Sequence, residues 1–555
     1  MTARSRTGGE ALIEALKIHG TDHAFCVPGE SYLAALDALY DARDTIRLVT
    51  CRQEGGAANM AEAYGKLTGK PGICFVTRGP GATNASIGVH TAFQDSTPMI
   101  LFIGQADQSM LDREAFQEVD FRAMFAPLAK WAAEIRDPDR ITEYVARAFH
   151  VATSGRPGPV VLSLPEDVLS GACTAPAAKP FAATQAAPSP EAMNTLQAML
   201  LRASNPIAIV GGPGWTAQAI ADMRAFAERF DLPVCTSFRA KDRLNNTHPN
   251  YCGDLGIGAD PKLVTRIEES DLLLVLGARL GEMTTNGYTR LSVPTPKQAL
   301  IHIHPSADEL NRVYRADLAV VSCTAPFLAA AASLSAPAQI AWRDARKDAR
   351  ADYEAWARPV AAPGAINPSD IYAWLRETLP DDAILTNGAG NYAAWLHRFY
   401  FYRAYPTLLG PTSGAMGYGL PAAVAAKILH PERTVVCAAG DGCFMMNGQE
   451  LATAVQHDAA IIVLVFDNGT YGTIRMHQER EYPARVIGTD LKNPDFAALA
   501  RSYGALGFTV NTMDDFRSAF SEAQVSGKPA LLHIKMDPEA ISPTTTISKL
   551  RAART

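Results

Sequence analysis

Length, composition and charge limit what this chain can be. Its 555 residues exceed what one hydrophobic core can organise, and a content of 48% hydrophobic and 19% charged residues indicates several buried cores. The formal net charge is −6 and there is no basic stripe with interleaved aromatics, so we expect no nucleic-acid partner.

The sequence also indicates whether the protein is secreted or membrane-bound. The N-terminus MTARSRTGGEALIEALKIHG lacks the apolar core of a signal peptide, and no stretch approaches the ~20 apolar residues of a membrane span. The nine cysteines include no CxxC pair, which favours reduced, buried thiols over disulfides or structural zinc. We therefore predict a cytoplasmic protein with no membrane partner.

Short apolar runs alternate with helical patterns along three stretches of the chain. The runs are GICFVT (72–77), MILFIG (99–104) and PVVLSLP (159–165), then PIAIVGG (206–212), LLLVLGA (272–278) and ALIHIHP (299–305), and finally AILTNGA (383–389), TVVCAAGDG (434–442), IIVLVFDN (461–468) and ALLHIKM (530–536). This alternation is typical of parallel βα sheets. Ala-, Pro- and Gly-rich linkers at 170–192 and 358–370 separate the stretches. We predict three doubly wound α/β domains, at residues 1–170, 190–335 and 366–540.

In the third stretch a carboxylate lies between two glycines, in AAGDGCFMMNG (438–448). Ligands of open α/β sheets sit beyond the carboxyl ends of strands, where glycines let phosphate oxygens approach backbone N–H groups. Asp441 can hold phosphate only through a cation, and Asn468 offers an amide oxygen at the end of the next strand. Each motif alone is an ordinary turn sequence. Together they suit Mg²⁺ that keeps diphosphate oxygens as its other ligands.

The paired motif resembles the thiamine diphosphate motif, in which GDG is followed by a strand that ends in NN. Four more stretches resemble the acetolactate synthase branch of thiamine-diphosphate enzymes: RQEGGAANMAEAYGKLTGKPGICFVTRGPGATN (52–84), AFQEVD (115–120), GRPGPVVLSLPEDV (155–168) and GAMGYGLPAA (414–423). The resemblance implies a pyrimidine-binding, a central and a diphosphate-binding domain, in that order. It also implies active sites between subunits, and therefore a homodimer or homotetramer.

Roles for individual residues follow from the resemblance. Glu54 would hydrogen-bond the pyrimidine ring of thiamine diphosphate, and Met416 would be the bulky residue that bends the cofactor. Asp441, Asn468 and the carbonyl of Thr470 would bind Mg²⁺. Further cofactor contacts are expected from Gly388, Gly414, Gly440, Gly442, Cys443, Tyr471 and Gly472.

Two places depart from the family pattern near this site. Asp467 replaces the usual Asn, and because it precedes the metal ligand we expect it to orient the turn. Ala389 and Gly390 replace a Gln and a His, so diphosphate contacts there must come from the backbone.

The substrate side is predicted from five positions. Gln117 and Lys130 match positions that line it, although Lys130 reads equally well as a solvated surface amine. Arg78 replaces a small Ser and could pair with a substrate carboxylate, or reach solvent or a neighbouring subunit. Thr473 and His477 stand where a Met and a Trp favour a larger acceptor, and His477 could relay a proton.

These features predict an enzyme that decarboxylates a 2-oxo acid, with pyruvate as the leading donor, and joins the product to a second carbonyl compound. A benzoylformate-type decarboxylase or aldehyde carboligase is the alternative, since NGTYGTIR (468–475) resembles those enzymes, although Thr77 replaces their histidine. A non-catalytic nucleotide-binding or regulatory subunit is the alternative from another class. For FAD, the central segment retains Arg279 but loses the acidic pair and arginine that normally follow, so we predict weak or absent binding.

Overall fold

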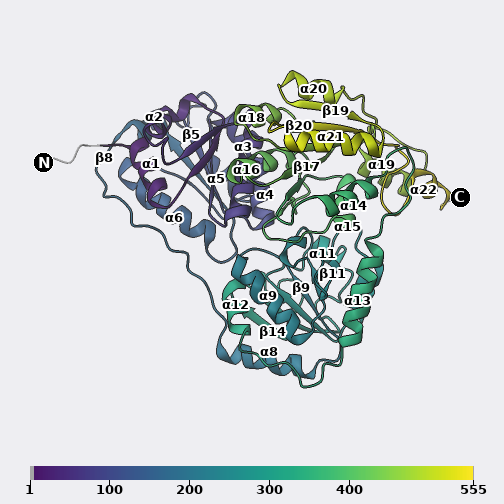
Figure 1. Ribbon diagram of the computed structural model, residues 1–555. Coiled ribbons are helices and arrows are strands. Elements are labelled where there is room, and N and C mark those ends of the chain that lie inside the picture. Colours follow the sequence, from purple (N-terminus) through teal and green to yellow (C-terminus); the bar gives the residue numbers. More distant parts are fainter. Residues whose placement is uncertain (1–5, 554–555) are drawn as a thin grey trace.

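A computed structural model describes residues 6–553 and contains three six-stranded parallel sheets, each in its own domain. In Figure 1 the first domain lies at the upper left, the third at the upper right and the middle domain below them. The prediction of three parallel α/β units is confirmed. A short antiparallel pair, β1 (Arg6–Thr7) with β8 (Ala172–Cys173), closes the first domain, and an extended segment then leads to the middle domain.

The first sheet has the strand order β3-β2-β4-β5-β7-β6. All strands are parallel, but β3 is added on one side of β2 and the strands from β4 onward on the other side. A topological switch point therefore lies between the carboxyl ends of β2 and β4. Its strands are β2 (His23–Cys26), β3 (Arg47–Thr50), β4 (Gly72–Val76), β5 (Met99–Gln105), β6 (Trp131–Glu134) and β7 (Pro159–Pro165). Its helices are α1 (Gly8–Ile18), α2 (Leu33–Asp41), α3 (Glu54–Thr68), α4 (Gly79–Asp95), α5 (Phe121–Phe125), α6 (Ile141–Thr153) and α7 (Glu166–Ser170).

The middle sheet has the order β11-β10-β9-β12-β13-β14, which is the order of dinucleotide-binding α/β folds. Its strands are β9 (Pro206–Val210), β10 (Val234–Thr236), β11 (Tyr251–Asp254), β12 (Leu272–Leu276), β13 (Ala299–His304) and β14 (Leu318–Val321). Its helices are α8 (Pro190–Arg202), α9 (Ala217–Phe230), α10 (Pro261–Glu269), α11 (Glu282–Thr285), α12 (Thr324–Ala331) and α13 (Arg343–Trp356).

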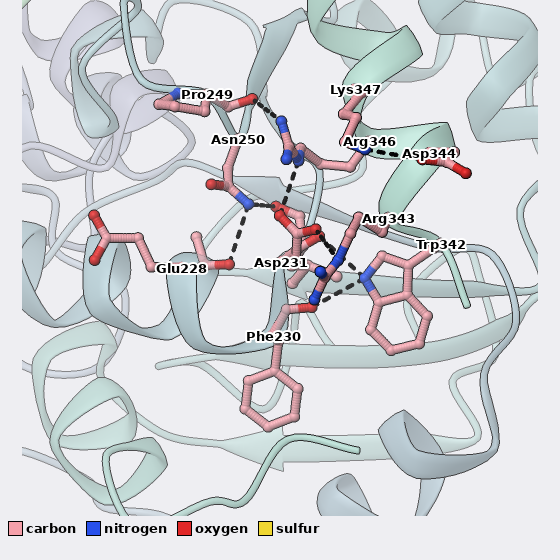
Figure 2. Close-up of polar contacts among 12 residues, drawn as sticks. Glu228, Phe230, Asp231, Pro249, Asn250, Trp342, Arg343, Asp344, Arg346 and Lys347 are labelled. Atoms are coloured by element: carbon pink, nitrogen blue, oxygen red, sulfur yellow. Dashed lines mark hydrogen bonds and ion pairs between the residues drawn. The ribbon is translucent and has the colours of Figure 1, made fainter. Parts of the chain in front are cut away.

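Helix α13 lies beyond the predicted middle segment but is fastened to it by polar contacts (Figure 2). Asp231 caps the C-terminus of α9 in a left-handed conformation, and its carboxylate accepts a hydrogen bond from Arg346 Nε at 2.9 Å. Trp342 Nε1 donates to the carbonyls of Phe230 and Asp231 at 3.0 and 3.1 Å. We therefore place α13 with the middle domain.

The third sheet repeats the first, with the order β16-β15-β17-β18-β20-β19 and its switch point between β15 and β17. Its strands are β15 (Ile384–Asn387), β16 (Leu408–Leu409), β17 (Val435–Gly440), β18 (Ile462–Asp467), β19 (Leu506–Val510) and β20 (Ala530–Lys535). Its helices are α14 (Pro368–Thr378), α15 (Tyr392–Phe399), α16 (Gly419–Leu429), α17 (Asp441–Phe444), α18 (Glu450–Gln456), α19 (Gly472–Glu481), α20 (Phe496–Ser502), α21 (Met513–Val525) and α22 (Ile547–Ala552).

The first and third domains share one hydrophobic core. Small side chains such as Ala57 and Ala61 on α3 and Ala422 and Ala426 on α16 are buried in the same cluster. Small residues let the two helices approach closely, so their contact is extensive and the two domains are held together.

Two further predictions can be compared with the described residues. The nine cysteines are free thiols; eight of them are buried and Cys323 is half-buried, as predicted. Within residues 6–553 no helix combines the length and the apolar character that crossing a membrane requires.

Candidate active site

The switch point of the third sheet brings the predicted metal and diphosphate residues together. Strands β15, β17 and β18 are neighbours, so the segments that follow Asn387, Gly440 and Asp467 meet at one edge. Asp441 opens the short helix α17 there, and Asn468 begins the turn that leads to α19. This edge is the place at which open α/β sheets bind ligands.

The carboxylate of Asp441 is almost fully buried, with 3% of the residue exposed. Its Oδ1 accepts the N–H of Gly442 at 2.8 Å, and its Oδ2 accepts Asn493 Nδ2 at 2.7 Å. Burial raises the pKa of Asp441 to about 6, because the buried anion has lost its water and these donors replace only part of it. A cation at this carboxylate would restore the balance.

The turn after β18 is held in a defined shape. The amide oxygen of Asn468 accepts the N–H of Thr470 at 3.3 Å, and Thr470 Oγ1 donates to the carbonyl of Thr489 at 2.9 Å. Asp467 Oδ1 accepts the N–H of Gly469 at 3.1 Å, so the expectation that Asp467 orients this turn is confirmed. Figure 1 shows α19, which follows the turn, at the outer side of the third domain beside α22.

Glycines line the same edge because side chains already occupy the space around them. A Cβ on Gly388 would lie 2.6 Å from the sulfur of Cys443, and one on Gly442 would lie 2.5 Å from Tyr471 Cε1. A Cβ on Gly440 would lie 2.9 Å from the ring of Tyr392. No substitution with a side chain fits at these positions without moving a neighbour, so only glycine allows the turns to pack this closely.

The hydroxyl of Tyr392 links these turns and was not predicted. It accepts the N–H of Gly388 at 2.9 Å and lies 3.1 Å from Cys443 Sγ, which also accepts the N–H of Gly417 at 3.2 Å. The N–H of Gly388 therefore already has a partner inside the protein. The loop of Gly414 and Met416 enters this network through Gly417, and Met416 packs, partly buried, against the core of the third domain.

These residues fit a magnesium ion with a diphosphate. Among the described residues no group of three or more His, Cys, Asp and Glu side chains could hold a metal by itself. A single buried carboxylate, an amide and a carbonyl leave half of an octahedral shell to phosphate oxygens and water. Asp441, Asn468 and the carbonyl of Thr470 would hold the ion, beside the glycine-lined backbone.

Glu54 is the first residue of α3 in the other domain, and it accepts Asn84 Nδ2 at 2.9 Å. The N–H groups of Arg52 and Gln53, just before it, donate to the buried carboxylate of Glu450 at 3.1 and 2.9 Å. Glu450 lies on α18, so the start of α3 is anchored to the third domain. Glu54 and Asp441 make separate sets of contacts within one chain.

Arg78 and Gln117 meet at the carboxyl end of β4. The guanidinium of Arg78 forms an ion pair with Glu166 and donates to the carbonyl of Phe116 at 3.1 Å. The carbonyl of Gln117, a residue with a φ of +63°, accepts the N–H of Gly79 at 3.0 Å. The charge of Arg78 is thus already paired within the chain.

Lys130 is not brought to this site. It precedes β6 at the amino end of that edge strand, and its Nζ donates to the carbonyls of Val151 and Ser154 at 2.5 and 2.7 Å. These carbonyls end α6, so Lys130 caps a helix. Burial lowers the pKa of Lys130 to about 8.

Thr473 and His477 lie on α19 but differ in their contacts. Thr473 Oγ1 donates to Asn391 Oδ1 at 3.0 Å, which joins α19 to the turn after β15. His477 is exposed, and its Nδ1 accepts Arg480 Nη2 at 2.6 Å. Within one chain only Thr473 is tied to the candidate site.

Comparison with known proteins identifies the family of the chain. Three family models match the chain: the thiamine pyrophosphate enzyme N-terminal TPP binding domain at residues 6–124, the central domain at 193–331 and the C-terminal TPP binding domain at 388–534. The chain therefore belongs to the thiamine pyrophosphate enzymes, and the resemblance seen in the sequence is confirmed.

Relatives of the chain carry a more specific name. It is 32% identical to an acetolactate synthase large subunit of Parasynechococcus marenigrum, over 95% of this chain and 87% of the relative. It is 31% identical to the acetolactate synthase isozyme 2 large subunit of Escherichia coli, over 96% of this chain and 95% of the relative. A probable acetolactate synthase large subunit of Methanocaldococcus jannaschii is 31% identical, over 97% and 93%.

Proposed function

We propose that the protein is an acetolactate synthase-like enzyme that decarboxylates a 2-oxo acid, with pyruvate as donor, and joins the product to a second carbonyl compound. The observation that carries the proposal is the buried Asp441 beside Asn468 and a glycine-lined edge, in a chain that belongs to the thiamine pyrophosphate enzymes. Bound thiamine diphosphate supplies the nucleophilic carbon and the electron sink that decarboxylation needs.

Each of the predicted site residues would have a separate role in this reaction. Asp441, Asn468 and the Thr470 carbonyl would hold Mg²⁺ and, through it, the diphosphate. Glu54 would share a hydrogen bond with the pyrimidine ring and so favour the proton arrangement that activates the cofactor. Met416 would fix the cofactor's bent shape, and Gln117 would line the substrate side.

Neither alternative is favoured by the comparisons. A benzoylformate-type decarboxylase or aldehyde carboligase would need a general acid–base group where Thr77 stands. Thr77 instead shares a hydrogen bond with Ser31, at 2.9 Å. A non-catalytic subunit would have no reason to keep Glu54, Asp441 and Asn468 together with their supporting contacts.

We further propose a cytoplasmic homodimer or homotetramer with active sites between subunits. Apolar side chains are exposed beside both halves of the site: Ile87 (38% exposed) lies next to the start of α3, and Met445 and Met446 (51% and 47%) follow α17. Such residues around a functional edge are typical of a surface that a partner covers. A second copy of the chain is the partner proposed here.

FAD binding would be weak or absent. Arg279, the residue retained from the flavin-contacting stretch, donates to Glu309 Oε2 at 3.2 Å and to the carbonyl of Gln94 at 3.5 Å. Glu309 also pairs with Arg156 and Arg312, so Arg279 belongs to an internal ion network. A purified protein that releases flavin on denaturation would contradict this proposal.

Two measurements test the function. Adding thiamine diphosphate and Mg²⁺ to the purified protein should change its near-ultraviolet circular dichroism, because the cofactor becomes fixed in a chiral site. Incubation of the loaded enzyme with a panel of 2-oxo acids and aldehydes, followed by product analysis, should then give acetolactate from pyruvate. Formation of free aldehyde alone would favour the decarboxylase, and no turnover with any donor would refute the proposal.

A further inference from the structure

Asp467, where the family usually has Asn, lies in a polar cluster next to the proposed metal site. Its Oδ2 accepts His533 Nε2 at 2.7 Å and Lys535 Nζ at 2.8 Å. Its Oδ1 accepts Asn493 Nδ2 at 2.7 Å. We refer to Asp467, Asn493, His533 and Lys535 as the Asp467 cluster.

The sheet explains why these residues meet. Strand β20 runs parallel to β18, with His533 opposite Val465 and Lys535 opposite Asp467, so alternate residues of β20 face the end of β18. His533 is only 1% exposed, and its ring lies edge-on to that of Phe496 with 5.0 Å between centroids. This packing keeps Nε2 of His533 directed at Asp467.

The number of donors explains why a carboxylate suits this position. The side chains of His533, Lys535 and Asn493 and the N–H of Gly469 all donate to Asp467, which offers two acceptor oxygens. An Asn at this position offers one oxygen, too few for the three side-chain donors and the N–H of Gly469.

One amide nitrogen connects this cluster to the candidate metal ligand. Asn493 Nδ2 donates to Asp467 Oδ1 and to Asp441 Oδ2, both at 2.7 Å. An amide NH₂ has two hydrogens, so both carboxylates are served by a single group. The position of each carboxylate then depends on the other.

We propose that the Asp467 cluster is a positioning device for Asp441: His533 and Lys535 hold Asp467, Asp467 holds Asn493, and Asn493 fixes the carboxylate that binds the metal ion. None of the four residues is among the proposed ligands of the ion. The inference rests on the proposed function, because it concerns how well the chain holds Mg²⁺ and thiamine diphosphate. Removing a residue that orients a metal ligand typically weakens metal binding about 10–100-fold.

The test is a Mg²⁺ titration of the purified full-length protein at fixed thiamine diphosphate, followed by tryptophan fluorescence. Asn493→Ala should raise the half-saturating Mg²⁺ concentration about 10–100-fold. Lys535→Met, at a side chain that is 48% exposed, should raise the half-saturating Mg²⁺ concentration by a smaller factor. This variant tests the inference even if Asn493→Ala does not fold. The matched controls are Lys492→Ala, next to Asn493, and Lys528→Met, at the other end of β20; both side chains are exposed and should leave that concentration unchanged.

A double variant separates positioning from general damage. If Asp467 acts through Asn493, then Asp467→Asn, which keeps one oxygen for the N–H of Gly469, combined with Asn493→Ala should lose no more Mg²⁺ affinity than the worse single variant. Additive losses contradict the inference, as does a variant that lowers the thermal midpoint of the free protein but keeps normal Mg²⁺ dependence. If the unmodified protein binds no thiamine diphosphate at any Mg²⁺ concentration, the proposed function fails too; if it binds and Asn493→Ala matches it, only the positioning inference fails.

Discussion

Two carboxylates at neighbouring strand ends, Asp441 and Asp467, show how single residues set the chemistry of this edge. Burial raises the pKa of Asp441, whereas donors from β20 and Asn493 hold that of Asp467 low. The charge of Asp467 is therefore compensated by donors of the protein, whereas that of Asp441 is left for a metal cation. This difference, rather than the number of acidic residues, supports Asp441 as the carboxylate of the proposed metal site.

Asp441→Ala tests the assignment of the metal ligand. The variant should lose Mg²⁺-dependent retention of thiamine diphosphate, because the remaining amide and carbonyl oxygens provide no negative charge to the ion. Gel filtration followed by an assay of bound cofactor, with and without chelator, measures it. Asp514→Ala is the control, since Asp514 is 94% exposed on the third domain. Tight, chelator-resistant cofactor in Asp441→Ala would refute the assignment.

Glu54→Gln tests the acid–base role of the other domain. The amide can still accept a hydrogen bond from Asn84, so thiamine diphosphate should bind with nearly unchanged affinity. Turnover should fall about 10²–10⁴-fold, the usual effect of removing one positioned acid–base group. The measurements are kcat with pyruvate and cofactor affinity on the same preparation. A variant with normal kcat would show that Glu54 has no such role.

His477→Trp tests the acceptor pocket. With Thr473 and His477 in place of a Met and a Trp, the unmodified protein should not prefer 2-oxobutyrate over pyruvate as acceptor, because the pocket is more polar. Restoring the Trp should raise that preference about 10-fold or more, the discrimination that one hydrophobic contact provides. A competition assay with equal concentrations of both acceptors decides. Strong 2-oxobutyrate selectivity in the unmodified protein would contradict the argument, and unchanged selectivity in His477→Trp would show that His477 does not face the acceptor.

At the scale of elements, Lys130 illustrates how a motif match and a structural role can differ. Its amine caps the C-terminus of α6, where a cation also favours the helix dipole. Lys130→Met should therefore lower the free energy of unfolding by about 1.5–3 kcal/mol, the value for a hydrogen bond to a charged group. KM for pyruvate should stay unchanged. Thermal unfolding measures the stability and steady-state kinetics measure KM, with Lys297→Met, at an exposed side chain, as the control. A raised KM with normal stability would show that Lys130 lines the substrate side.

The elements also show what the sequence could and could not predict. The length of an apolar run predicts strands such as β12 and β17, and the glycine that follows the run predicts the ligand-bearing turn. Both predictions succeed because burial and turn geometry depend on local sequence. Asn493 and Tyr392 were missed, since each acts through a contact that only the fold creates. Asn493 lies in a loop without a pattern, and Tyr392 reads as an ordinary aromatic core residue until its hydroxyl is seen between Gly388 and Cys443.

At the scale of the whole molecule, the shared core of α3 and α16 fixes the first and third domains of one chain together. The start of α3 is tied to Glu450, while Glu54 and Asp441 have separate contacts. Apolar residues are exposed beside each half of the site. In the proposed assembly Glu54 of one subunit would face Asp441 of another, which would cover these residues and complete the site.

Mixing two inactive variants tests this assembly directly. Glu54→Gln and Asp441→Ala chains are each nearly inactive alone, but in a mixed pair one site receives both changes and the other receives neither. If subunits exchange at random, about one quarter of all sites should therefore be intact, and activity should recover to about that fraction. The control mixes each variant with itself under the same mild dissociation and reassociation. If each site is formed within a single chain, every site in the mixed pair carries one change, so activity would stay at the level of the separate variants.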